Sequence, residues 1–212
     1  MRVGADGVGD LRGLREKLPY LKALGVTTLW LMPMLQSADH QHGYHVTDYE
    51  RVDWDLGDDA DLADLNRAAH AAGLKVLIDD VINHSSRFHP WFEASFADAN
   101  GSTRYRDYYV WCADGSFGFG RDIYYQKLGV ELGWGDIPDL NLSNPFVFRY
   151  FVDVAKHWMD PNGDGNFDDG VDGFRLDHVT GPDHAVWKEL RRELKSFRPD
   201  VALIAEAFTD MA

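Results

Sequence analysis

The sequence has almost no cysteine, an excess of acidic over basic residues and no long apolar run. Its single cysteine, Cys112, excludes an internal disulfide framework and favours a reducing compartment. The formal charge of −14 argues against nucleic acid or an anionic membrane as a partner. No apolar leader follows Arg2, and no run reaches membrane-spanning length. We therefore expect a soluble chain, with the cytoplasm as the favoured location.

What the sequence does contain is an alternation of amphipathic helices and apolar strands. The 212 residues are 45% hydrophobic, enough for one domain or part of a larger one. Strands that are apolar on both faces are typical of a parallel sheet covered by helices. The expected strands are 26–34, 75–82, 171–176 and 201–205, and the expected helices are 11–24, 58–72, 146–159 and 183–197. The prediction is an α/β fold with its chemistry at the carboxyl ends of the strands.

A long segment interrupts this alternation. Residues 85–143 are crowded with Tyr, Trp, Phe, Gly and Asp, and a connection of that length is rarely a plain loop. We interpret it as a small inserted domain. The chain then divides into a first sheet portion (1–84), the inserted domain (85–143) and a second sheet portion (144–212).

The stretch GVDGFRLDHV (170–179) predicts a strand that ends on a carboxylate. Because side chains alternate along a strand, Arg175 and Asp177 lie on the same face. A guanidinium beside a carboxylate favours the ionised acid, which suits a nucleophile. The alternative is a structural ion pair at a strand end.

Other strand ends and a nearby loop also carry polar residues: Tyr44, Asp79, Asn83, His84 and Glu206. Two carboxylates from neighbouring strands suit glycoside cleavage, and a separation of roughly 5–5.5 Å would indicate retention of anomeric configuration. Each residue also has a structural interpretation. Asn83 and His84 could cap a strand, and Glu206 could be a surface acid.

The segment DPNGDGNFDD (160–169) has the spacing of a calcium loop. Asp160, Asn162 and Asp164 occupy positions one, three and five, Gly165 follows at six and Asp168 at nine. No glutamate stands at the twelfth position. A bound calcium ion and a solvated acidic turn remain alternatives.

Several stretches resemble motifs of the alpha-amylase family, glycoside hydrolase family 13, and they occur in the family's order. They are GVTTLWLMPM (25–34), HGYHVTDY (42–49), DDVINH (79–84), IPDLN (137–141), GFRLDH (173–178) and AEAF (205–208). The resemblance implies a partial TIM (β/α)8 barrel containing strands that resemble the second to fifth, with 85–143 as the family's inserted B domain.

Carried over position by position, the resemblance assigns the catalytic roles. Asp177 corresponds to the nucleophile, Glu206 to the general acid/base, and Arg175 to the partner that keeps Asp177 ionised. A general acid must hold a proton near neutral pH, so we expect a less polar or like-charged surrounding for Glu206.

The same resemblance assigns residues that bind substrate and metal. His84 would bond a sugar hydroxyl, Tyr44 would stack beneath that sugar, and Asp79 would support the site from below. Asn83 corresponds to a ligand of a structural calcium in many relatives. Calcium is thus the one implied cofactor, and no organic cofactor is implied.

The implied activity is that of a retaining α-glycosidase acting on α-linked glucose oligo- or polysaccharides. Transglycosylases and isomerases share these motifs, and a non-catalytic carbohydrate-binding relative is a further alternative. The family's later His-Asp motif, with its third carboxylate, does not follow Glu206, and His45 stands where relatives usually have Asp. We therefore expect a fragment that is inactive by itself.

Overall fold

A computed structural model describes residues 9–38, 42–98, 101–111, 115, 117 and 137–207. The helices are α1 (Leu11–Ala23), α2 (Asp59–Ala71), α3 (Pro90–Ala97), the short 3-10 helix η1 (Arg104–Tyr108), α5 (Pro145–Met159) and α6 (His184–Phe197). The strands are β1 (Thr28–Leu31), β2 (Leu35–Ser37), β3 (Val46–Val52), β4 (Lys75–Asp80), β5 (Gly173–Leu176) and β6 (Ala202–Ala205).

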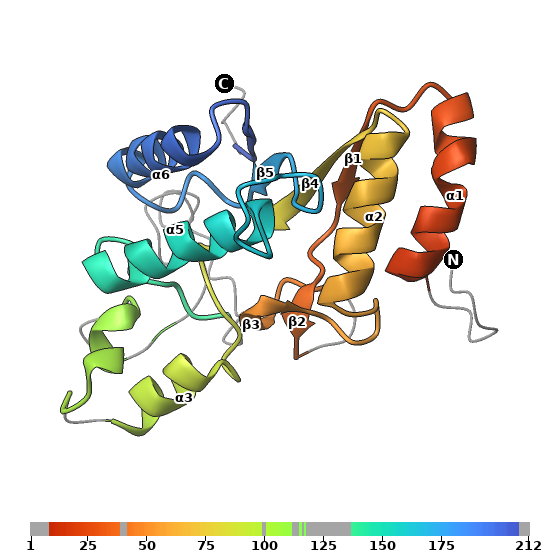
Figure 1. The fold of residues 1–212 in the computed structure, drawn as a ribbon. Helices are drawn as coiled ribbons and strands as arrows, with labels where there is room; N and C mark the ends of the chain where they lie inside the picture. The colour runs from red at the N-terminus through yellow and green to blue at the C-terminus, as the bar shows by residue number, and fades with distance from the viewer. Residues whose placement is uncertain are drawn as a thin grey trace, which may run out of the picture.

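A four-stranded sheet forms the centre of the molecule, in the order β1-β4-β5-β6. Every neighbouring pair in it is parallel, and each crossover passes through at least one helix. In Figure 1, α1 and α2 lie beside β1 and β4, whereas α5 and α6 lie beside β5 and β6. The described sheet is open, so the fold is part of an α/β barrel, as the sequence predicts.

The sequence explains where the helices begin. Asp58 accepts the N–H of Asp61 while the Asp61 carboxylate accepts the N–H of Asp58, a capping box that starts α2. Asn144 caps α5 ahead of Pro145, which has no N–H to satisfy at the first helical position. Asp183 caps α6. Each cap satisfies backbone donors that the helix itself leaves unpaired, so the predicted starts are confirmed.

The core lies between the central strands and the helices. β5 is buried along its whole length, and β4 is buried after Lys75. A buried Leu, Ile or Phe side chain contributes roughly 1.5–3 kcal/mol relative to exposure. Among the largest fully buried side chains are Leu62, Leu65, Ile78, Phe151, Trp158, Phe174, Leu190 and Leu194.

The two outer strands differ from the prediction. Segments 26–34 and 201–205 were expected to be buried strands, but β1 and β6 contain only four residues each. Trp30 is 51% exposed and Ile204 is 52% exposed. Each outer strand pairs on one side only within the described sheet, and a strand is buried on both faces only when both faces are covered.

The structure contains a further strand directly after the loop that was expected to carry Tyr44. Residues 46–52 form β3, which pairs antiparallel with β2 through an irregular register. Val46, Tyr49 and Val52 are the buried residues of this strand. Their spacing of three departs from the strict alternation that indicates a strand, so the sequence pattern did not predict β3.

The inserted segment is described only in part. Helices α3 and η1 lie at the lower end of the molecule in Figure 1, on the side to which β4 points. Phe92 of α3 packs against the rings of Tyr109, Trp111 and Phe117. Residues 118–136 lie outside the described residues, so the proposed domain boundaries stay a prediction. No helix among the described residues is both long and apolar enough to cross a membrane.

Candidate functional site

The parallel sheet places polar residues of three strands at one edge. Asp79 of β4 is the register partner of Arg175 in β5, so the two side chains lie on the same face of adjacent strands. Asp177 comes directly after β5, and Glu206 comes directly after β6. The chain therefore brings together at this edge a set of charged residues that are far apart in the sequence.

Arg175 is the centre of this set. Its Nη1 lies 2.7 Å from Oδ1 of Asp79 and 2.6 Å from Oδ1 of Asp177. Its Nη2 forms an ion pair with Oε1 of Glu206. Asp79, Arg175 and Asp177 are all buried. Because the guanidinium is planar and rigid, it fixes three carboxylates relative to one another.

Tyr44 and His84 complete the edge of this site. The Tyr44 hydroxyl donates to Oδ2 of Asp79 over 3.3 Å, and Nε2 of His84 lies 3.2 Å from the Tyr44 carbonyl oxygen. Burial lowers the pKa of His84 to about 3, so its ring is neutral at physiological pH. A neutral imidazole can donate through one nitrogen and accept through the other, which suits contact with a hydroxyl.

The electrostatics of Asp177 differ from the expectation. Burial raises the pKa of Asp177 to about 7, against the opposing charge of Arg175, and the carboxylates of Asp79 and Glu206 add to the rise. Arg175 was expected to keep Asp177 ionised. Desolvation of the buried carboxyl outweighs that attraction, so Asp177 exchanges its proton near neutral pH.

The surrounding of Glu206 contains the like-charged carboxylates of Asp79 and Asp177, as expected, and in addition the cation of Arg175. Besides its ion pair with Arg175, its Oε2 accepts the backbone N–H of His178 over 3.1 Å. Both partners donate to the Glu206 carboxyl, whereas a general acid must itself donate a proton. In this conformation Glu206 is an acceptor, and acid catalysis requires Arg175 to release it.

The site contains residues that the sequence analysis did not single out. Trp30 lies with its ring centroid 5.3 Å from the Arg175 guanidinium carbon, as in a cation–π contact. Asp80 is buried, and burial, with Asp79 and Asp177 adding, raises its pKa to about 8. Its Oδ2 has no hydrogen-bond partner within the described part of the chain. Strand alternation puts Asp80 on the face opposite Asp79, so only its burial could have identified it.

His178 has a left-handed backbone, with φ of +48°, directly after Asp177. A non-glycine residue in this region is uncommon and costs free energy. The turn brings the His178 N–H to Glu206, so the strain lies where β5 and β6 present their carboxylates.

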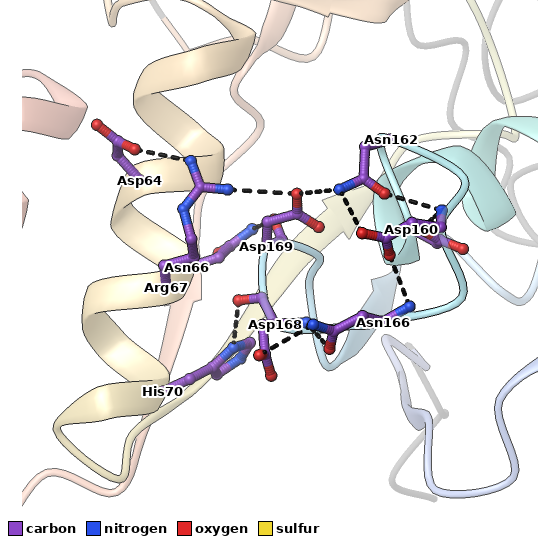
Figure 2. Close-up of polar contacts among 10 residues, drawn as sticks. Asp64, Asn66, Arg67, His70, Asp160, Asn162, Asn166, Asp168 and Asp169 are labelled. Atoms are coloured by element: carbon purple, nitrogen blue, oxygen red, sulfur yellow. Dashed lines mark hydrogen bonds and ion pairs between the residues drawn. The ribbon is translucent and has the colours of Figure 1, made fainter.

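The predicted metal ligands lie in two places. Nδ2 of Asn83 is 3.4 Å from Oδ1 of Asp139, beyond the end of β4. The loop that follows α5 holds the others, and Figure 2 shows that Asp169 reaches Asn162 there, whereas Asp168 faces Asn166. Among the described residues, no three His, Cys, Asp or Glu side chains already form a metal-binding group.

Comparison with known proteins identifies the family. The model of the alpha-amylase catalytic domain matches residues 1–212. Alpha-amylase 3 of Dictyoglomus thermophilum is 40% identical over 211 residues, which are 96% of this chain and 40% of that protein. A trehalose synthase of Pimelobacter is 35% identical over 230 aligned residues, covering 96% of this chain and 38% of that protein.

Solved structures agree with the sequence comparison. The crystal structure of alpha-amylase from H.orenii superimposes with a TM-score of 0.79 at 34% identity, covering 98% of this chain and 45% of that one. This chain thus spans less than half the length of these relatives. Because the family model covers the whole chain and the fold agrees, the chain belongs to the alpha-amylase family.

Proposed function

We propose that this chain carries the catalytic carboxylates of a retaining α-glycosidase that acts on α-glucans or malto-oligosaccharides. Asp177 is the nucleophile and Glu206 the general acid/base. Asp79, Tyr44 and His84 bind the sugar in the cleavage subsite. The observation that carries this proposal is the contact of one guanidinium, that of Arg175, with the carboxylates of Asp79, Asp177 and Glu206.

The chemistry follows from that arrangement. Asp177 in its ionised form attacks the anomeric carbon, and Glu206 donates a proton to the departing oxygen. A covalent glycosyl–enzyme ester results, which water then hydrolyses while Glu206 takes the proton back. Arg175 holds Asp177 in place and stabilises negative charge in the resting site.

A second candidate function is transfer or isomerisation by the same carboxylates. A relative with 35% identity carries the name trehalose synthase, and both reactions share the glycosyl–enzyme step. The difference lies in the acceptor. Water gives hydrolysis, and a sugar hydroxyl held in the cleft gives transfer.

Asp177→Asn tests the proposed role of the nucleophile. Wherever turnover of malto-oligosaccharides is measurable, we expect the substitution to lower it at least about 10³-fold, because amides do not form the ester. The exposed Asp153→Asn on α5 is the matched control and should retain activity. Proton NMR of the first product should show the α-anomer. Full activity of Asp177→Asn, or a β-anomer as the first product, would contradict the assignment.

A further inference from the structure

The loop between α5 and β5 contains four carboxylates, and its last part lies against α2 (Figure 2). They belong to Asp160, Asp164, Asp168 and Asp169. Asp160 directs both oxygens at the loop's own backbone, accepting the N–H of Asp164 over 3.2 Å and that of Gly165 over 3.0 Å. These bonds close the loop into a tight turn. Asp164 likewise accepts the backbone N–H of Asn166 through Oδ1, over 2.7 Å, and only its Oδ2 faces a side chain.

Two of these carboxylates converge on one atom. Nδ2 of Asn162 lies 3.1 Å from Oδ2 of Asp164 and 3.0 Å from Oδ2 of Asp169. The two acids come from different parts of the loop, and their carboxylates repel each other because both lie against the same nitrogen atom. A single neutral amide group therefore occupies the point at which two negative charges meet.

A second observation concerns oxygens that are buried without a donor. Asp169 is 7% exposed, and its Oδ1 has no hydrogen-bond partner among the described residues, whereas Arg67 and Asn162 both contact Oδ2. In Figure 2 this free oxygen is on the side facing the loop. Oδ1 of Asn66 is likewise buried and unpartnered, while its Nδ2 donates to the Asp169 carbonyl oxygen over 2.9 Å.

Oxygens of this kind require a cation or water. A buried carboxylate oxygen without a donor costs free energy, and within the described part of the chain the guanidinium of Arg67 reaches only the other oxygen of Asp169, over 3.3 Å. Ca²⁺ prefers carboxylate, amide and carbonyl oxygens and accepts irregular geometry, whereas Mg²⁺ demands a near-ideal octahedron. An irregular loop with acidic and amide side chains fits calcium better.

We propose that this loop binds one Ca²⁺ through the carboxylates of Asp164 and Asp169 and the amide oxygen of Asn162. Asp160 positions the turn, and backbone oxygens and water supply the remaining ligands. Oδ1 of Asn162 accepts the backbone N–H of Asp164 over 2.9 Å in the structure, so binding exchanges this hydrogen bond for the ion as the amide turns its oxygen between the two acids. Asp168, which the loop spacing favours, is outside the ligand set, because its side chain faces Asn166 and not the amide of Asn162 (Figure 2).

The position of the loop gives the ion a structural consequence. Arg67 and Asn66 of α2 contact Asp169, and three residues later Asp172 accepts the N–H of Val76 in β4 over 2.9 Å. Arg175 follows on β5, and Asp177 comes directly after that strand. An ion at Asp169 therefore stabilises the start of the strand that presents the proposed nucleophile, and this inference is independent of the reaction catalysed.

Titration calorimetry with calcium chloride on the 212-residue chain tests the proposal. Asp169→Asn should weaken binding at least about tenfold, the cost of losing a group at a metal site. Asp168→Asn, an adjacent change of the same charge, is the matched control and should shift the affinity less than about twofold. The total heat does not test the proposal, because a further calcium ion is expected near Asn83 and would also release or absorb heat. The test is therefore the difference in calcium affinity between Asp168→Asn and Asp169→Asn.

The remaining outcomes are also decisive. Circular dichroism checks that each variant folds. If Asp169→Asn does not fold, Asp164→Asn replaces it in the test and should weaken calcium binding by at least about tenfold as well. Equal effects of Asp168→Asn and Asp169→Asn would overturn the ligand assignment. Heats unchanged by either Asp169→Asn or Asp164→Asn would show that water alone serves these oxygens and that the loop binds no calcium.

Discussion

At the scale of single residues, burial decides the charge of the acids in the site. Asp79 and Asp80 are consecutive, yet only Asp79 contacts Arg175. Burial raises the pKa of Asp79 as well, and Arg175 opposes that rise. Asp80 lies on the other face of β4 without such a cation, and its pKa reaches about 8. Charge balance in this site thus depends on the face of the strand that each residue occupies.

The raised pKa of Asp80 predicts a pH-dependent stability. The unfolded carboxyl has a pKa of about 3.9, so between about pH 4 and pH 8 the folded protein keeps a proton that the unfolded chain has lost. Stability should therefore fall as the pH rises through this range. Asp80→Asn is uncharged at every pH and should remove much of this fall, leaving a smaller share from Asp177.

Thermal melting at pH 5 and pH 8 measures this effect. For a chain of this size, each kcal/mol corresponds to about 2–4 °C in the melting temperature. Asp80→Asn should melt several degrees above the wild type at pH 8 and close to it at pH 5. Asp153→Asn on the surface of α5 is the control. A variant with the same pH profile as the wild type would mean that Asp80 is ionised in the folded protein.

At the scale of elements, sequence reasoning succeeded where a local rule is strong. The caps at Asp58, Asn144 and Asp183 are local hydrogen-bonding devices, so the starts of their helices could be predicted. The chain order of strands and helices likewise predicted the parallel sheet and the meeting of Asp79, Arg175, Asp177 and Glu206 at its edge.

The remaining features depend on tertiary contacts that no local pattern contains. β3 has buried residues at a spacing of three because the register with β2 is irregular. Spacing alone favoured Asp168 in the acidic loop, yet Asp169 turns inward because α2 supplies Arg67 and Asn66. The ion pair of Glu206 likewise depends on the position of Arg175 on the neighbouring strand.

Another element-scale contact links α2 to β5 through a histidine. Nδ1 of His70 lies 2.7 Å from the Asp168 carbonyl oxygen, and Nε2 lies 2.8 Å from Oδ2 of Asp172. Both partners only accept, so both ring nitrogens must donate, which requires the protonated ring. The hydrogen bond to Asp172 raises the pKa of His70, although partial burial and the nearby Lys75 oppose the rise.

His70 should therefore stabilise the fold at low pH. A raised pKa means that the contribution is complete below the unfolded value of about 6.5 and is lost as the pH rises through the folded value. We expect His70→Gln to cost about 1 kcal/mol at pH 5.5 and much less at pH 9, measured by urea unfolding. The exposed His184→Gln is the control. An equal cost at both pH values would show that His70 acts only through neutral packing.

At the scale of the whole molecule, the open sheet determines what the chain can do alone. β1 and β6 each pair on one side only within the described residues, and Trp30 and Ile204 expose large apolar surfaces beside them. An open edge with exposed apolar residues favours association and leaves a strand poorly fixed. Asp177 lies after an inner strand, whereas Glu206 follows the outer strand β6.

This asymmetry predicts that the 212-residue chain by itself shows no measurable turnover of malto-oligosaccharides. Catalysis by two carboxylates requires both to be held in one geometry, and a misplacement of about 1 Å can cost on the order of 10²-fold. Here the Glu206 carboxylate, which follows the outer strand, forms an ion pair with Arg175, and this contact must open before Glu206 can donate a proton to the substrate. Reducing-sugar release by the purified chain, compared with that of its Asp177→Asn variant, measures this. If the purified chain shows turnover and Asp177→Asn abolishes it, four strands are enough to hold the site and this prediction is wrong. The same result would still identify Asp177 as the nucleophile.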